Sequence, residues 1–426
     1  MTADYKTCAA VWISWIPALL GLGAACSSSN SSHIPNTIAA PADNVAEVSV
    51  DYGLPSSPYI NGLFATITVC VPGTSDCQEV DHLLVDTGSS GLRLLSSVLT
   101  LALPSRTGAT GGVLAECSQF IDSFVWGPLQ TADLRVAGEL ADGLAIQVIG
   151  ESTYPVPKDC TGSDASNVTD LGANGLLGVS AFLQDCGPAC AAAPGANSEN
   201  PGMYYECPST AAGGCQAVAV PVVEQVSNPV AFFSQDNNGS IIELPGIPAA
   251  GAPSVTGALV FGIGTQANNS LGEAAVLRLD AYGDLLTTFS SNGSAVTAFV
   301  DSGSNAIYFL DSATTHIPTC SDADYSDFYC PTSTVNLSAK ILDSYGSVPV
   351  GVDFSIANAV GLSANNNYSN VAFDNLGGPG VTSQSGGTTN EATYFDWGLP
   401  FHFGRNVFTA IEDQSTPAGN GPFVAF

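Results

Sequence analysis

Apolar residues in this chain come mostly in short runs that Gly, Pro, Asn and Ser interrupt, and long stretches of helical periodicity are few. Short runs of β-branched, aromatic and aliphatic residues between turn residues are typical of strands. Residues 63–69 form one such run, a turn at Pro72 and Gly73 follows, and residues 78–85 lead directly into Asp86. The pattern predicts an all-β fold with few short helices, and a hairpin that ends at Asp86.

A longer apolar stretch near the N-terminus predicts export. Residues 9–25 follow Lys6 and end in the small residues Gly23, Ala24 and Ala25, which is the pattern of a signal peptide. The stretch is shorter than the ~20 residues that a membrane-spanning helix needs, and no second one follows. We therefore expect residues 1–25 to be removed from an exported protein.

The end of this segment resembles a bacterial lipobox, in which a cysteine becomes the lipidated first residue of the mature protein. The candidate attachment site is Cys26, although Gly23 stands where Leu is usual, and ordinary cleavage is the alternative. Residues 26–44 begin with a serine-rich run, which is typical of a flexible tether. By this resemblance, Ser27 after the cysteine implies sorting to the bacterial outer membrane. We therefore expect a protein at the outer membrane or in the periplasm that contacts the membrane only through its lipid, the alternative being a secreted protein.

Cysteine usage also indicates an oxidising compartment. Of the 12 cysteines, Cys8 and Cys26 lie in the N-terminal segment, and the other ten are an even number, as disulfides require. Neighbouring positions predict Cys70–Cys77 and Cys320–Cys330, whereas the pairing within residues 186–215 stays open. A zinc site is the alternative, but paired Cys-x-x-Cys motifs are missing from the sequence, so we expect no metal.

A short motif in the first half of the chain recurs in the second half. Residues 85–90 read V-D-T-G-S-S and residues 300–305 read V-D-S-G-S-N; each copy follows a strand-like run and precedes another. At similar distances downstream lie two apolar elements that end in Gly178 and Gly398, while Gly404 offers a second register for the latter. This duplication predicts two homologous β lobes, at residues 45–235 and 236–426.

The paired motifs resemble those of the pepsin-like aspartic peptidases, and the resemblance covers nearly the whole mature chain. It implies a bilobal fold in which Asp86 and Asp301 meet in a cleft between the lobes. It also assigns the hydroxyl groups and glycines that support the two catalytic turns: Thr87, Gly88, Ser89, Ser302, Gly303 and Ser304.

Two carboxyls that share one proton can take a proton from water and give one to a peptide carbonyl, because like charges this close cannot both ionise. The resemblance therefore implies an aspartic endopeptidase that cuts extended polypeptides without a cofactor. We expect it to act as a monomer.

Two features depart from the family. The resemblance places a substrate-covering flap near residues 124–127, where Trp126 before Gly127 replaces the family's Tyr; the alternative is that Trp126 is a core or hairpin aromatic residue. Arg93 stands where an aromatic residue is common; we expect it on the solvated face of a strand, the alternative being an inward orientation toward the dyad. The two departures motivate a second hypothesis, a catalytically inactive pepsin-like protein that binds peptides or proteins at the cell surface.

Charge excludes one further class of function. The chain has 38 acidic residues against 8 Lys and Arg, a net charge of −30. Such a surface has no basic patch that could replace the counterions of a phosphate backbone, so nucleic acid is not a partner.

Overall fold

The computed structural model describes residues 37–121, 123–195, 200–208, 214–289, 294–365, 369–380 and 394–426. The predicted signal peptide and Cys26 lie outside the described residues. Residues 37–44, at the end of the predicted tether, contact the folded chain: the Ala39 N–H donates to Glu243 Oε2 at 2.6 Å, and the Thr37 carbonyl accepts from Asn406 at 3.1 Å.

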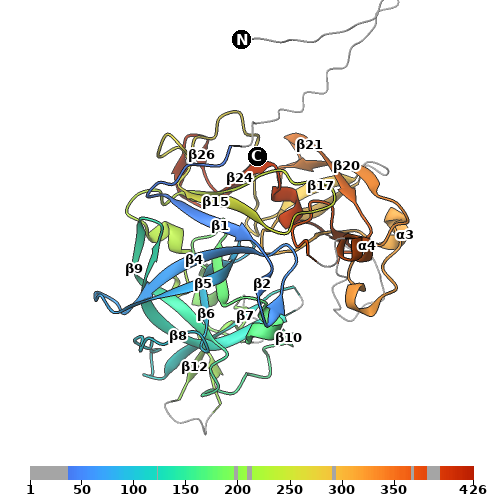
Figure 1. Cartoon of the computed structure of the whole chain (residues 1–426). Coiled ribbons are helices and arrows are strands. Elements are labelled where there is room, and N and C mark those ends of the chain that lie inside the picture. The colour runs from blue at the N-terminus through green and yellow to red at the C-terminus, as the bar shows by residue number, and fades with distance from the viewer. Residues whose placement is uncertain are drawn as a thin grey trace, which may run out of the picture. The chain divides into compact units, whose positions relative to one another are not determined.

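Two large sheets dominate the described part of the chain, and the predicted all-β class is confirmed (Figure 1). The larger sheet has 16 strands: β1 (Val45–Val50), β4 (Leu63–Cys70), β5 (Cys77–Asp86), β6 (Ser90–Leu95), β7 (Val113–Gln119), β8 (Ser123–Val136), β9 (Glu139–Ile149), β10 (Ser163–Asp164), β11 (Gly175–Val179), β12 (Tyr204–Cys207), β13 (Gln216–Ala217), β14 (Gly239–Leu244), β15 (Val255–Phe261), β16 (Val276–Arg278), β24 (Arg405–Ala410) and β27 (Phe423–Ala425).

The second sheet belongs to the second half of the chain. Its strands are β17 (Leu285–Phe289), β18 (Ala295–Val300), β19 (Ile307–Phe309), β20 (Val335–Leu342), β21 (Pro349–Ile356), β22 (Gly377–Gly378) and β23 (Tyr394–Trp397). Two small pairs complete the described strands: β2 (Gly53–Leu54) with β3 (Ser57–Pro58), and β25 (Ser415–Thr416) with β26 (Gly419–Asn420).

Helices are few and short in the described ranges. The α-helices are α1 (Val168–Leu171), α2 (Pro188–Ala191), α3 (Ser312–Thr315) and α4 (Ala359–Asn365). The 3-10 helices are η1 (Val222–Glu224), η2 (Pro229–Phe232), η3 (Ala323–Tyr325) and η4 (Leu399–His402).

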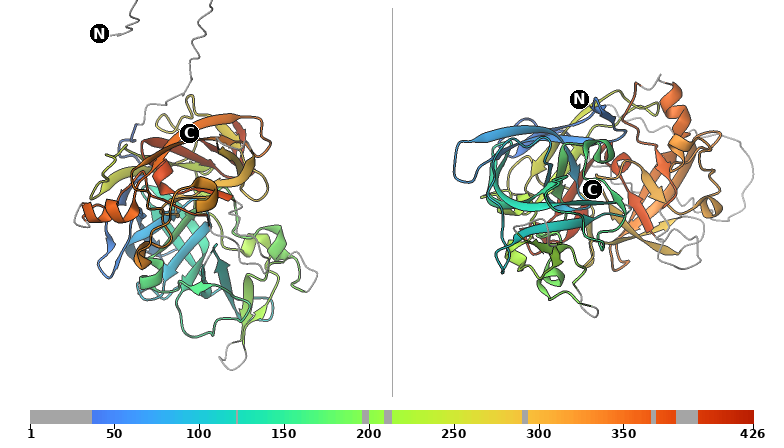
Figure 2. Two further views of the ribbon diagram at one scale, coloured as in Figure 1. Left: turned by 90° about the vertical axis from the view of Figure 1, so that its right-hand side faces the viewer. Right: turned by 90° about the horizontal axis from the view of Figure 1, so that it is seen from below.

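The fold is a bilobal, pepsin-like β fold. The strands of the first half and those of the second sheet form separate groups in both views of Figure 2, each around its own apolar cluster. The last strands of the chain return to the larger sheet, where β24 pairs with β14 and thereby joins the two groups. The described residues form one compact unit, so the division at residue 235 stays a prediction.

Alternation of side chains explains how each half forms its core. Along β1 the residues Ala46, Val48 and Val50 are buried while Glu47 is exposed, as expected for a strand with one face on a core. In the second half the core is aromatic: Phe395 and Trp397 stack with their ring centroids 4.3 Å apart. Burial of these rings fixes the register of β23, which carries a glycine element of the predicted site.

Five disulfides join the ten cysteines beyond the N-terminal segment. Cys70–Cys77 and Cys320–Cys330 confirm the predicted local pairs, and Cys70 and Cys77 close the predicted hairpin of β4 and β5. The structure settles the others as Cys117–Cys160, Cys186–Cys190 and Cys207–Cys215. Disulfides at this density indicate an exported or extracellular protein.

Candidate active site

The first repeated motif forms a tight turn between β5 and β6. Asp86 ends β5 and is 6% exposed. Its Oδ1 accepts the Gly88 N–H at 2.8 Å, and its Oδ2 accepts the Ser89 hydroxyl in a very short hydrogen bond. Both carboxylate oxygens therefore have a donor from their own turn, which fixes the orientation of the side chain.

The second motif forms the same turn between β18 and β19. Asp301 follows β18, its Oδ1 accepts the Gly303 N–H at 2.8 Å, and its Oδ2 accepts the Ser304 hydroxyl at 3.0 Å. The two motifs that the sequence predicted to be equivalent thus hold their aspartates with equivalent donors.

Crossed hydrogen bonds connect the two turns. The Thr87 N–H donates to Ser302 Oγ at 3.1 Å, and the Ser302 N–H donates to Thr87 Oγ1 at 2.9 Å. The hydroxyls continue across the interface: Ser302 donates to the Val85 carbonyl at 2.7 Å and Thr87 to the Val300 carbonyl at 3.2 Å. Because these groups are buried, losing one partner would leave an unsatisfied donor or acceptor.

Each glycine element is a strand inserted beside its turn. Strand β11 runs parallel to β5 with Gly178 opposite Asp86, and antiparallel to β6. Strand β23 lies in the same way between β18 and β19, and places Gly398 next to the second turn. A Cβ atom on Gly398 would lie 2.1 Å from the Ala306 carbonyl oxygen, and one on Gly178 would lie 2.7 Å from that of Ser89. Gly398, not Gly404, is therefore the counterpart of Gly178.

The two carboxyls come together because the turns carry glycine. A Cβ atom on Gly88 would lie 2.8 Å from Asp301 Cγ, and one on Gly303 would lie 2.7 Å from Asp86 Oδ1. Each carboxyl therefore packs directly against the backbone of the opposite turn. Burial, the nearby charge of Asp86 and a hydrogen bond between the two side chains raise the pKa of Asp301 to about 8. The pair consequently holds one proton at neutral pH.

The dyad opens into a large cleft. The cleft has a volume of about 1660 Å³ and is lined by both aspartate turns and by the tip of the hairpin of β7 and β8. The cleft residues at that tip are Phe120, Ile121 and Ser123, and Ile121 is 56% exposed. The volume exceeds the ~300–1,000 Å³ usual for a small-molecule pocket, and suits a polymer better.

The predicted flap residues do not reach the cleft. Trp126 is 2% exposed, its indole N–H donates to the Tyr154 carbonyl at 3.0 Å, and its ring contacts Tyr205. A Cβ atom on Gly127 would lie 1.9 Å from the Val148 carbonyl oxygen, so this glycine permits close packing of strands. The hairpin turns before Ser123, and Trp126 therefore lies on its buried part. The prediction placed the flap contact too late in the chain.

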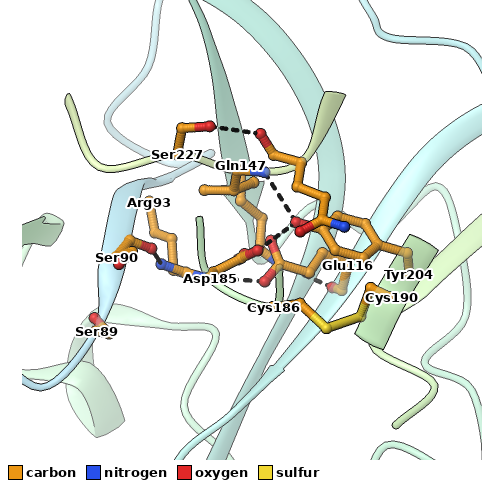
Figure 3. Close-up of polar contacts among 12 residues, drawn as sticks. Ser89, Ser90, Arg93, Glu116, Gln147, Asp185, Cys186, Cys190, Tyr204 and Ser227 are labelled. Atoms are coloured by element: carbon orange, nitrogen blue, oxygen red, sulfur yellow. Dashed lines mark hydrogen bonds and ion pairs between the residues drawn. A yellow bond between two sulfur atoms is a disulfide. The ribbon is translucent and has the colours of Figure 1, made fainter. Parts of the chain in front are cut away.

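The expectation that Arg93 is solvated is wrong. Its side chain is fully buried and lies between Glu116 of β7 and Asp185, at 2.9 and 3.1 Å, with a third hydrogen bond to the Ser90 carbonyl at 2.7 Å (Figure 3). Burial, and then the neighbouring Glu116, raise the pKa of Asp185 well above its usual range. Tyr204 donates to Asp185 at 2.6 Å. Arg93 thus ties the strand after the first catalytic turn to the hairpin strand β7.

Sequence reasoning missed a third carboxyl beside the dyad. Asp396 lies on β23, two residues before Gly398, and is 2% exposed. Burial, followed by the charges of Asp301 and Asp86, raises the pKa of Asp396 well above its usual range. The signal was a charged residue within an otherwise apolar glycine element.

Among the described residues, no cluster of His, Cys, Asp and Glu has the arrangement of a metal site. Within the same ranges, no helix combines the length and apolar character that crossing a membrane requires.

Comparison with known proteins agrees with the fold. Among solved structures, an aspartic proteinase from Irpex lacteus is similar, with a TM-score of 0.50 and 14% identity over 89% of this chain and 96% of that one. At this identity the likeness shows the fold alone. A search of curated proteins finds no match. The model of the family described as "Protein of unknown function (DUF3443)" matches residues 40–426. This chain therefore belongs to that family.

Proposed function

We propose that this protein is an aspartic endopeptidase. One observation carries the proposal: two repeated turns, locked by crossed hydrogen bonds, bring Asp86 and Asp301 together on the wall of a large cleft. The similarity of the fold to that of the aspartic proteinase from Irpex lacteus supports it. The similarity of the two turns accounts for the duplication in the sequence, since each turn supplies one carboxyl.

The proposed chemistry uses the single proton of the dyad. The ionised carboxyl takes a proton from a water molecule as the water oxygen attacks the peptide carbonyl carbon, while the other carboxyl gives its proton to the carbonyl oxygen. The tetrahedral diol then breaks down. Its C–N bond breaks, one of its hydroxyl protons passes to the ionised carboxyl of the dyad, and the protonated carboxyl gives its proton to the leaving nitrogen. The raised pKa of Asp301 favours the singly protonated pair up to about pH 8.

The proposed substrate is an extended polypeptide. It would lie across the cleft beneath the tip of the β7–β8 hairpin, where the exposed Ile121 and neighbouring Phe120 offer apolar contacts. Binding as an added strand would satisfy the peptide backbone, and side-chain pockets would then select the sequence.

The test is to incubate the purified protein with an unfolded protein from acid to neutral pH, with and without a statine-type inhibitor. We expect cleavage that the inhibitor blocks and that Asp86→Asn and Asp301→Asn each lower by at least about 1000-fold. Thermal unfolding of both variants is the control for folding. Cleavage by neither wild type nor variants, or by all three alike, would contradict the proposal and favour a binding protein that lacks activity.

We further propose that the exported protein is lipid-anchored at Cys26 on the bacterial outer membrane or in the periplasm. The lipobox-like junction and the serine-rich residues after it support this, and the five disulfides fit an exported protein. Growth with labelled palmitate should label the wild type and not Cys26→Ser. Equal labelling of the two proteins would contradict the proposed lipid anchor.

A further inference from the structure

The lining of the active-site cleft is strongly acidic. Besides the dyad and Asp185, which is paired with Arg93, five carboxyl groups contribute to its wall: Asp164, Asp170, Asp284, Asp327 and Asp396. The basic side chain among the described lining residues is Arg93, and Glu116 and Asp185 already neutralise it. None of the five acids has an ion-pair partner in the described part of the chain. The exposed carboxylates of this wall, Asp164, Asp170 and Asp327, therefore present uncompensated negative charge to a ligand.

Asp396 is the innermost of these groups, and it is incompletely satisfied. The residue is only 2% exposed, and its Oδ1 has no hydrogen-bond partner among the described residues. The side chain lies beside Ser304, which also bonds Asp301. A buried carboxyl oxygen without a donor costs free energy, and an approaching ammonium or guanidinium group is the kind of charge that would stabilise its ionised form.

The acidic lining continues into a hollow that adjoins the cleft. A second hollow of about 640 Å³ shares Tyr59, Asp170 and Asn305 with the cleft, and Asp322 and Asp324 add two further carboxylates to it. A polypeptide that leaves the cleft along this side would pass three exposed carboxylates in succession. Charge complementarity of this kind acts on specificity and association rate more than on raw affinity.

We propose that the cleft selects cationic polypeptides, with Lys or Arg side chains close to the bond that is cut, and that Asp396 is a specificity-determining residue. The inference rests on the proposed peptidase function and adds its substrate class. The overall charge of −30 attracts cations weakly at any point of the surface, whereas the uncompensated carboxyls within the cleft make the selection local.

The test compares peptides that are identical except for Lys, Gln or Glu at the positions flanking the cut. We expect kcat/KM to be about 10-fold higher for Lys than for Gln and lower still for Glu, with the preference shrinking in 0.5 M salt. Asp396→Asn should reduce the preference several-fold, mainly through KM. If that variant fails to fold, the double variant Asp170→Asn and Asp284→Asn, at an exposed and a half-buried position of the cleft wall, should reduce it instead. Asp76→Asn, on the exposed turn before β5, is the matched control and should leave it unchanged.

The outcomes separate this inference from the proposed function. Equal cleavage of the Lys, Gln and Glu peptides would overturn the substrate class and leave the peptidase intact. If the wild type cuts none of these peptides, the binding of fluorescently labelled copies of them tests whether the cleft prefers cationic ligands. Tighter binding of the Lys peptide, lost in the cleft variants and kept in Asp76→Asn, would support the cationic ligand without the activity. Equal or absent binding would overturn the inference.

Discussion

The two aspartate turns, at residues 86–89 and 301–304, share one backbone frame but differ in the side chains around it. In both, an aspartate accepts a glycine N–H and a serine hydroxyl, and a glycine-ended strand runs parallel to the strand that leads into the turn. The difference lies in one register pair: Leu176 of β11 is opposite Arg93, whereas Asp396 of β23 is opposite Tyr308.

This difference places the ionisable side chain on opposite members of the pair: on the strand after the turn in the first half, and on the glycine element in the second. In the first half the charged residue is Arg93, which is buried and paired with Glu116 of β7 and with Asp185. The glycine element there carries the apolar Leu176. In the second half the ionisable group, Asp396, stands in that element beside the dyad, without an ion pair in the described residues. The repeated frame is fixed by its hydrogen bonds, so these positions are free to serve stability in one half and ligand contact in the other.

The largest effect should come from breaking the charged cluster of the first half. Arg93→Met leaves Glu116 and Asp185 buried without a cation, and we expect it to lower the free energy of unfolding by about 3–5 kcal/mol. Tyr308→Phe, the matched change in the second half, removes one hydrogen bond to Asn305 and should cost about 1 kcal/mol. Urea unfolding measures both.

A companion variant keeps the first prediction falsifiable. Adding Glu116→Gln and Asp185→Asn to Arg93→Met should restore part of the lost stability, because the uncompensated carboxyls are then gone. Wild-type stability in Arg93→Met alone would show that the cluster contributes nothing.

The second prediction concerns the glycines that let the carboxyls meet. Gly88→Ala and Gly303→Ala each place a methyl group against the opposite aspartate, and we expect each to lower kcat by about 100-fold through displacement of the dyad. Gly351→Ala, where nothing lies within 4 Å of the added atom, is the control. A large loss in only one of the two turn variants would break the equivalence of the turns.

The hydroxyls of Thr87 and Ser302, which link the two turns, should contribute equally to stability. Thr87→Val and Ser302→Ala each leave a buried N–H without its acceptor, and each should cost about 1–3 kcal/mol of unfolding free energy. The double variant should cost less than the sum, because both remove the same link. Denaturant unfolding of the three variants checks this, and strict additivity would argue against a shared link.

The smallest expected effect is the pH dependence of stability. The pKa of Asp301 is raised from 3.8 to about 8, and those of Glu243 and Asp284 to about 7 and 6, with burial as the largest cause of each. A raised folded-state pKa means that the folded protein favours the protonated form, so this stability is present below about pH 4 and is lost as the pH rises toward 8. We expect Tm to be about 5 °C higher at pH 5 than at pH 8.5. Asp301→Asn should flatten the dependence of Tm on pH. An unchanged dependence would show that this carboxyl does not cause it.

Much of the frame was predictable because it depends on local residue types. The hairpin into Asp86, the two local disulfides and the order of the repeated motifs follow from turn residues, alternation and spacing. Trp126 was misplaced because the point where a hairpin turns depends on strand pairing, which spacing from Asp86 does not report. Arg93 was misread for a related reason: its partner Glu116 lies on another strand, and no local pattern announces a buried ion pair.

The sequence by itself determined the β class, the duplication and which aspartates carry the proposed chemistry, since each of these is written in neighbouring residues or in their repetition. Only the tertiary structure decided what surrounds the dyad: the hairpin tip over the cleft, the charged cluster behind it, and Asp396 beside it. Burial and charge pairing arise between segments that are distant in the chain, and the pKa values and ligand preference of a cleft depend on those contacts.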